Sequence, residues 1–205
     1  MVEHHLEEKA PITLTERLRT IFKQPLEKVG LFVHGLGIKP NSITMFGLIG
    51  TILGSYLVAR GNLVIGGVII LIMGPIDALD GAVARVSKEV TKFGAFIDSV
   101  SDRYIEIFIY GGLLWYFNSV QNTQGVLLTF LASAGSVLVS YTRARAQSLG
   151  LETKVGILTR FERMVVIGPS LIFSYPLIGV GLVALFANIT AFQRIVHVKK
   201  QSEVK

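Results

Sequence analysis

The chain has 205 residues, of which 51% are hydrophobic and 17% charged, with a mean hydropathy of +0.57 and a formal net charge of +6. This composition excludes an ordinary soluble domain, and the absence of cysteine excludes disulfides and thiolate metal sites. At about 20 apolar residues per transmembrane helix, the length predicts one integral membrane domain of about six spans.

The N-terminal region is charged and lacks the basic-then-apolar order of a cleavable signal peptide, so we expect it to remain attached. Residues 13–36 mix Leu, Ile, Phe and Val with Arg and Lys, which is typical of an amphipathic helix at a membrane surface, here bent near Pro25. A soluble packing helix is the alternative. We therefore divide the chain into an N-terminal tail with an interfacial helix, residues 1–36, and a transmembrane domain, residues 37–200.

Six transmembrane helices are predicted in the second part, which makes the fold all-α. The turn sequence GIKPNSIT precedes the first of them, and Asn41 or Ser42 is the predicted N-cap. The apolar runs place the first four spans at about 42–59, 62–79, 95–117 and 124–146. A longer apolar run, 164–198, is divided at Pro176 into a fifth and a sixth span.

Charge placement predicts the orientation. Of the 20 Lys and Arg residues, only Arg60 falls in a loop on the side of the 116–124 and 174–179 connections. By the positive-inside rule, both termini and the acidic residues 77–102 lie on the cytoplasmic side of the cell membrane. The same asymmetry explains the sequence pI of about 9.7 through contact with anionic lipids, so no nucleic-acid partner is expected.

Four aspartates stand in otherwise apolar stretches. Asp77 and Asp80 are three residues apart and Asp98 and Asp102 are four apart, so each pair projects from one face of its helix. A carboxylate in hydrocarbon costs about 2.5–3.5 kcal/mol or more, and such residues are kept where they bind cations, pair or line a wet cavity. Oxygen ligands alone suit Mg²⁺ or Mn²⁺, and two such ions would clamp a diphosphate.

The residues between the two acidic pairs suit a phosphorylated ligand. Gly81 has no Cβ and would let a nucleotide approach the backbone, although a packing glycine is the alternative. Arg85 offers a planar, bidentate contact to phosphate. Lys88 and Lys92 are interpreted as solvated loop residues.

The whole stretch reads D-x2-D-G-x2-A-R-x8-G-x3-D-x3-D from Asp77 to Asp102 and resembles the CDP-alcohol phosphotransferases, membrane enzymes of phospholipid synthesis. The resemblance implies that the four aspartates hold two Mg²⁺ ions, with Mn²⁺ as an alternative, and that Asp102 is the base for the acceptor hydroxyl. It also implies a CDP-lipid site formed by Asn41, Ser42, Ile43, Thr44, Asp77, Gly81, Arg85 and Thr91. A homodimer is expected from the family resemblance only.

Arginines at three predicted helix ends form a second polar concentration, which suits an acceptor with its own phosphate, although positive-inside anchoring explains part of it. The order SY-x-[basic]-A-R-A, then G-x3-R-x-E-R, then Q-R is similar to the phosphatidylinositol-phosphate synthase branch, apart from Phe161, where proline is frequent. This similarity implies that the acceptor phosphate is held by Ser140, Arg143, Arg145, Arg160 and Arg194, with Arg163 as a neighbour.

The resemblance as a whole implies a transferase that moves the phosphatidyl group from a CDP-linked lipid, CDP-diacylglycerol or an ether-lipid relative, to a phosphorylated polyol with release of CMP. Inositol phosphate is the expected acceptor, and glycerol 3-phosphate, as in phosphatidylglycerol-phosphate synthase, is the alternative. Outside this class, an ion transporter would also keep intramembrane acids, and a prenyl transferase also uses aspartate-rich metal motifs.

Overall fold

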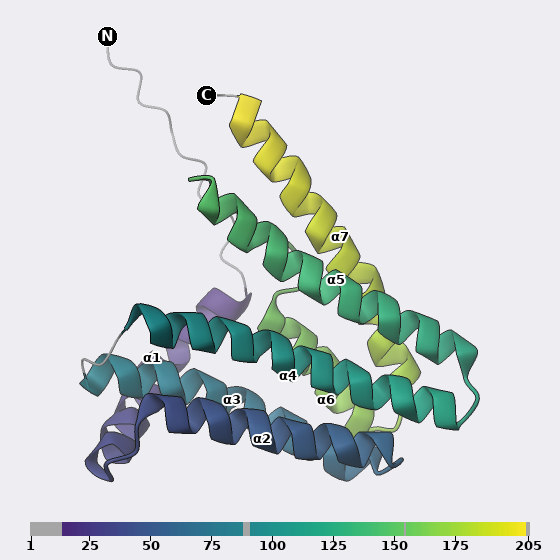
Figure 1. Cartoon of the computed structure of the whole chain (residues 1–205), viewed down its shortest axis with the longest axis horizontal. Coiled ribbons are helices and arrows are strands. Elements are labelled where there is room, and N and C mark those ends of the chain that lie inside the picture. Colours follow the sequence, from purple (N-terminus) through teal and green to yellow (C-terminus); the bar gives the residue numbers. More distant parts are fainter. Residues whose placement is uncertain (1–13, 88–90, 154, 204–205) are drawn as a thin grey trace.

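The computed structural model describes residues 14–87, 91–153 and 155–203, with the side chains from residue 24 onward except those of 77 and 78. These ranges contain seven α-helices and no strand, so the all-α prediction is confirmed for them (Figure 1). The helices are α1 (Leu14–Gly35), α2 (Pro40–Ala59), α3 (Leu63–Ser87), α4 (Lys92–Ser119), α5 (Thr123–Ser148), α6 (Arg160–Ile172) and α7 (Pro176–Glu203).

The start of α2 differs from the prediction. Asn41 and Ser42 are not its cap, because the helix begins at Pro40 and Lys39 is the N-cap residue, in an extended conformation and without a side-chain cap bond. Proline suits the first helical position because its missing N–H would have no partner there. The fixed φ of Pro40 thus starts the helix three residues before Ile43, where the apolar run begins.

At the starts of α4, α5 and α6, polar side chains accept hydrogen bonds from backbone N–H groups that have no partner within the helix. Thr91 accepts a hydrogen bond from the N–H of Gly94 at 2.9 Å before α4, and Asn122 accepts one from the N–H of Gly125 at 2.8 Å before α5. At α6 the carboxylate of Glu162 accepts from the N–H of Thr159 at 2.5 Å, which is one half of a capping box.

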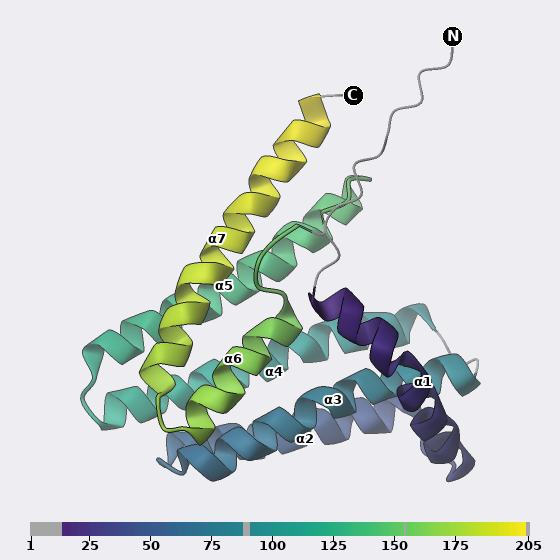
Figure 2. The ribbon, with the colours of Figure 1, turned by 180° about the vertical axis from the view of Figure 1, so that it is seen from behind.

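Three tight turns of one kind join α2 to α3, α4 to α5 and α6 to α7, and all three lie at the same end of the molecule (Figures 1 and 2). In each turn an N–H bonds to the carbonyl five residues earlier: Asn62 to Leu57 at 2.9 Å, Asn122 to Phe117 at 2.8 Å, and Tyr175 to Ser170 at 2.7 Å. This is the bond of a Schellman C-cap, which needs one left-handed residue. Those residues are Gly61, Gln121 and Ser174.

Small residues let α2 pack closely against its neighbours. A Cβ on Gly66 of α3 would lie 2.7 Å from the carbonyl oxygen of Gly54, and a Cβ on Gly112 of α4 would lie 2.4 Å from the carbonyl oxygen of Ser55. These backbone approaches hold α2, α3 and α4 together at the lower side of Figure 1, while α5 and α7 run side by side and lean away from them.

Four of the described helices are long and apolar enough to cross a bilayer: α2, α3, α5 and α7. The chain is therefore a membrane protein. The two other predicted spans are helical as well, but α4 begins with charged residues, and α6 has 13 residues, about 20 Å at 1.5 Å per residue against a hydrocarbon core of about 30 Å. As predicted from Pro176, a helix boundary divides the last apolar run.

Helix α1 covers the end of the bundle opposite the three turns (Figure 2). It packs against α3 at Gly30, where an added Cβ would lie 3.3 Å from the backbone of Ala82. Leu31 and Phe32, the next two residues of the helix, are exposed. The helix therefore touches the bundle along one side and presents apolar side chains on another.

Candidate active site

The first acidic pair lies on α3, beside the start of α2. Asp80 is 6% exposed, and its carboxylate accepts a hydrogen bond from the hydroxyl of Thr44. The backbone of Asp77 is part of α3, but its side chain lies outside the described residues. The structure thus brings Thr44, a predicted CDP-lipid residue, against Asp80, a predicted metal ligand 36 positions away in the chain.

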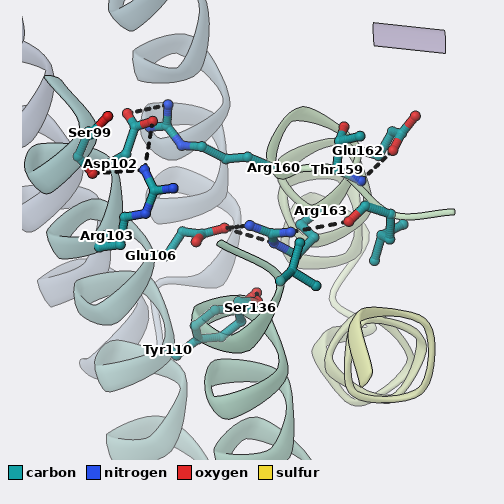
Figure 3. A network of polar contacts seen from close by, with 12 residues as sticks. Ser99, Asp102, Arg103, Glu106, Tyr110, Ser136, Thr159, Arg160, Glu162 and Arg163 are labelled. Atoms are coloured by element: carbon teal, nitrogen blue, oxygen red, sulfur yellow. Dashed lines mark hydrogen bonds and ion pairs between the residues drawn. The ribbon is translucent and has the colours of Figure 1, made fainter. Parts of the chain in front are cut away.

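The second acidic pair lies on the first turns of α4, where Asp98 and Asp102 are both partly buried. Asp102 forms an ion pair with Arg160, the first residue of α6, and a longer one with Arg103 at 3.5 Å (Figure 3). Arg103 also donates to the carbonyl of Ser99 at 2.8 Å. The predicted base and one predicted acceptor arginine therefore meet across two helices.

The carboxylates fit a hard divalent cation by their chemistry. The donors available from Asp80, Asp98 and Asp102 are all oxygens, which Mg²⁺ and Mn²⁺ prefer. Among the residues that the structure describes, no three His, Cys, Asp or Glu side chains are grouped closely enough to hold an ion, and Asp77, predicted to be a ligand, falls outside that search.

Two further motif positions have local explanations. A Cβ added at Gly81 would lie 3.4 Å from Nη1 of Arg85, whose side chain is exposed. The absence of a Cβ at Gly81 therefore leaves space beside the Arg85 guanidinium. A Cβ on Gly94 would lie 3.0 Å from the hydroxyl of Thr91, the oxygen that caps α4. Gly94 thus leaves room for the cap, and Thr91 positions the helix that carries the second acidic pair.

Three other predicted acceptor arginines lie on α5 and α7. Arg194 is 4% exposed and donates from Nε to the carbonyl of Val155 at 3.0 Å and from Nη1 to the carbonyl of Val139. Arg143 and Arg145 are exposed at the end of α5, where Arg145 bonds to Ser148 at 3.3 Å. Ser140 is half-buried on the same helix.

One charged residue of this region was not singled out from the sequence. Glu106 is 3% exposed; it accepts a hydrogen bond from Nε of Arg163 at 2.8 Å and forms an ion pair with Nη2 at 2.6 Å, and Arg163 itself is 1% exposed. The signal was present, because an acid within the apolar run YIEIFIY needs a partner. Removing one member of such a buried pair costs about 3–5 kcal/mol of folding free energy.

Comparison with known proteins gives a consistent result. Residues 38–196 match the CDP-alcohol phosphatidyltransferase family. The archaetidylinositol phosphate synthase of Pyrococcus horikoshii is 38% identical over 192 residues, which cover 93% of this chain and 100% of that protein. The phosphatidylinositol phosphate synthase of Streptomyces avermitilis is 32% identical over 207 residues, covering 92% and 84% respectively.

Solved structures of Mycobacterium tuberculosis phosphatidylinositol phosphate synthase share the fold. The crystal structure with CDP-DAG bound has a TM-score of 0.78 and 27% sequence identity, and the match covers 84% of this chain and 92% of that one. A structure of the same enzyme in complex with manganese and citrate also has a TM-score of 0.78 at 27% identity, covering 84% and 88%.

Proposed function

This chain belongs to the CDP-alcohol phosphatidyltransferase family, and from that premise we propose that it transfers the phosphatidyl group of a CDP-linked lipid, such as CDP-diacylglycerol, to inositol phosphate. The acceptor hydroxyl attacks the β-phosphorus of the donor, the bond to the CMP oxygen breaks, and CMP leaves. The family match confirms the resemblance inferred from the aspartate motif and excludes a transporter or a prenyl transferase.

Inositol phosphate is favoured over glycerol 3-phosphate by the relatives. The P. horikoshii protein is named as an archaetidylinositol phosphate synthase and the S. avermitilis protein as a phosphatidylinositol phosphate synthase. The two names differ in the lipid part and share the inositol phosphate headgroup. We therefore propose inositol phosphate as the acceptor for this chain. The arginines of α5, α6 and α7 supply positive charge for its phosphate.

In this proposal, Asp77, Asp80, Asp98 and Asp102 hold two Mg²⁺ ions, or Mn²⁺, the metal in one structure of the M. tuberculosis enzyme. The ions neutralise charge on the donor diphosphate and on the departing CMP. Thr44 fixes the Asp80 carboxylate by its hydrogen bond. The donor's cytidine and phosphates are bound by the neighbouring residues Asn41, Ser42, Ile43, Thr44, Gly81, Arg85 and Thr91.

The observation that carries the proposal is the ion pair between Asp102 and Arg160. A guanidinium has five N–H donors in one plane, so Arg160 can bind an acceptor phosphate while it still contacts the carboxylate. An acceptor held there places a hydroxyl beside Asp102, which takes its proton. The proposed phosphate-binding set is completed by Ser140, Arg143, Arg145 and Arg194, with Arg163 as a neighbour.

We further propose that all six helices α2 to α7 form the transmembrane domain, residues 37–200, with the active site on the cytoplasmic side of the cell membrane. In the N-terminal part, residues 1–36, helix α1 lies at the interface, and the predicted tail before it falls outside the described residues. This is supported by the three turns at one end, which contain Arg60 and no other Lys or Arg, and by the exposed apolar residues Leu31 and Phe32. A homodimer is carried over from the family resemblance.

The experiment that tests the reaction uses purified protein in detergent or lipid nanodiscs with Mg²⁺, CDP-diacylglycerol and either labelled inositol phosphate or labelled glycerol 3-phosphate. We expect CMP release and a labelled lipid with inositol phosphate. Turnover with glycerol 3-phosphate alone would move the chain to the phosphatidylglycerol-phosphate synthases. CMP release with neither acceptor would contradict the proposal.

A further inference from the structure

The helices α4 and α6 are connected by two ion pairs of different character. Asp102 with Arg160 is partly open to solvent, with side chains that are 15% and 25% exposed. Glu106 with Arg163 lies one turn further along both helices and is nearly sealed, at 4% and 1%. Figure 3 shows the two pairs one above the other between the helices. The more exposed pair, Asp102 with Arg160, belongs to the proposed site, and the buried pair, Glu106 with Arg163, lies next to it.

Every nitrogen of the Arg163 guanidinium has a partner within the protein. Nε and Nη2 contact one oxygen of Glu106 at 2.8 and 2.6 Å, and Nη1 donates to the carbonyl of Leu158 at 3.1 Å. With 1% of its surface exposed, this side chain is not placed to receive a phosphate. Its contacts instead fix three parts of the fold: α4, α6 and the segment before α6.

The network continues to α7, and a second buried hydrogen bond beside it joins α4 to α5. The N–H of Leu158 donates to the hydroxyl of Thr190 on α7 at 3.1 Å, so the residue held by Arg163 is also tied to the last helix. One turn beyond Glu106 on α4, Tyr110 shares a hydrogen bond of 2.9 Å with Ser136 on α5. The Glu106–Arg163 pair therefore connects α4, α6 and α7, and the Tyr110–Ser136 bond adds α5 one turn away.

We propose that Glu106 and Arg163 are positioning residues for the transfer reaction, which set the rotation and height of α6 against α4 so that Arg160 reaches Asp102 and the acceptor phosphate. Apolar side chains would hold the helices together without specifying one register. A short, buried ion pair that includes a directed hydrogen bond specifies it, because guanidinium and carboxylate meet well only in a narrow range of geometries. The inference rests on the proposed function, since it takes Arg160 as the acceptor ligand.

The test replaces the pair by apolar residues of similar size, Glu106→Leu with Arg163→Met, a change that often leaves folding stability unaltered or raised. We expect a melting temperature within about 5 °C of wild type. We also expect an acceptor KM that rises, or an acceptor kcat/KM that falls, by roughly 10- to 100-fold, because small misplacements of a ligand cost that much. The KM for the CDP-lipid should stay near its wild-type value. A folded double variant with wild-type acceptor kinetics would overturn the proposal.

If the double variant fails to fold, Arg163→Lys decides, because lysine keeps the charge and loses the planar contact. The proposal predicts that this variant binds CDP-lipid normally and uses the acceptor at least several-fold less well, and unchanged acceptor kinetics would overturn it. The wild-type protein separates this result from the proposed function. If wild type uses glycerol 3-phosphate instead of inositol phosphate, the function proposal fails in its acceptor, and both variants are measured with glycerol 3-phosphate.

Discussion

Asp102 stands between two arginines, and its place in the fold explains how one carboxylate can serve two purposes. Arg160 reaches it from α6 and Arg103 from the next position on α4. The two guanidinium groups hold the carboxylate in place, and its two proposed roles, metal ligand and base, both require a fixed position. The sequence motif predicted Asp102 in the site. The partner was predicted only as a phosphate ligand, because helix spacing on two separate segments does not show which side chains will face each other.

Replacing Asp102 by Asn keeps the shape of the side chain and removes the base. We expect turnover to fall by about 10²- to 10⁴-fold, the usual contribution of a positioned base. Metal-dependent binding of the CDP-lipid should be largely retained because Asp80 and Asp98 remain. Steady-state CMP release and lipid-binding titration measure the two quantities. Glu203→Gln, an exposed carboxylate at the end of α7, is the matched control. Wild-type turnover in Asp102→Asn would remove this residue as the base.

The Thr44 hydroxyl gives a second test at this scale. Thr44→Val removes the hydroxyl that donates to the buried Asp80 carboxylate and that also contacts the carbonyl of Pro40, one turn earlier on its own helix, at 3.3 Å. Because a hydrogen bond to a charged group contributes about 1.5–3 kcal/mol, we expect metal-dependent CDP-lipid affinity to fall by roughly 10- to 100-fold. Thr51→Val on the same helix is the control, since that hydroxyl bonds only to the carbonyl of Gly47, one turn earlier on its own helix, at 2.9 Å. Equal affinities in the two variants would argue against a role for Thr44.

At the scale of the helices, apolar periodicity predicted the elements well and their starts less well. The runs after residue 62 and after Pro176 begin helices close to the expected positions. The start of α2 was missed because a proline at the first position replaces a side-chain cap. The apolar run around Glu106 indicates that this acid needs a partner, but the sequence does not identify Arg163 as that partner, because it lies 57 residues away.

The three helix turns offer an internal comparison of stability. Gln121 and Gly61 occupy the same position in their turns, with φ of 55° and 86°. A residue with a Cβ is strained there by about 1–2 kcal/mol. Glycine avoids this strain, but it loses more conformational entropy on folding, which offsets part of the gain. Gln121→Gly should therefore raise the free energy of unfolding by roughly 0.5 kcal/mol, and Gly61→Gln should lower it by about 1 kcal/mol.

Thermal unfolding of the detergent-solubilised protein measures both changes. A shift of about 2–4 °C per kcal/mol is expected for a chain of this length. Neither turn lies near the aspartates, so CMP release should remain at the wild-type rate. Two shifts of the same sign would contradict the account of the turns.

For the whole molecule, composition and one motif predicted the membrane class, the family and the reaction, and these are confirmed by the four apolar helices and the family match. Composition could not predict how the helices pair. The close approach of Gly54 and Gly66, and of Gly112 and Ser55, depends on backbone contacts between distant segments, and small-residue spacings in the sequence do not name their partners. The arrangement brings the start of α2, the end of α3 and the start of α4 together, as a site built from residues 41–102 requires (Figure 1).

The most direct measurement of the central claim is the number of divalent ions that the protein binds together with its donor. Titration of the metal-free protein with Mn²⁺, followed by electron paramagnetic resonance in the presence of CDP-diacylglycerol, should show about two ions per chain, as in two-metal phosphoryl-transfer sites. Asp80→Asn and Asp98→Asn should each reduce both the number of ions and the affinity for CDP-diacylglycerol. CDP-diacylglycerol that binds equally well in excess chelator, and equally well to both variants, would contradict the account.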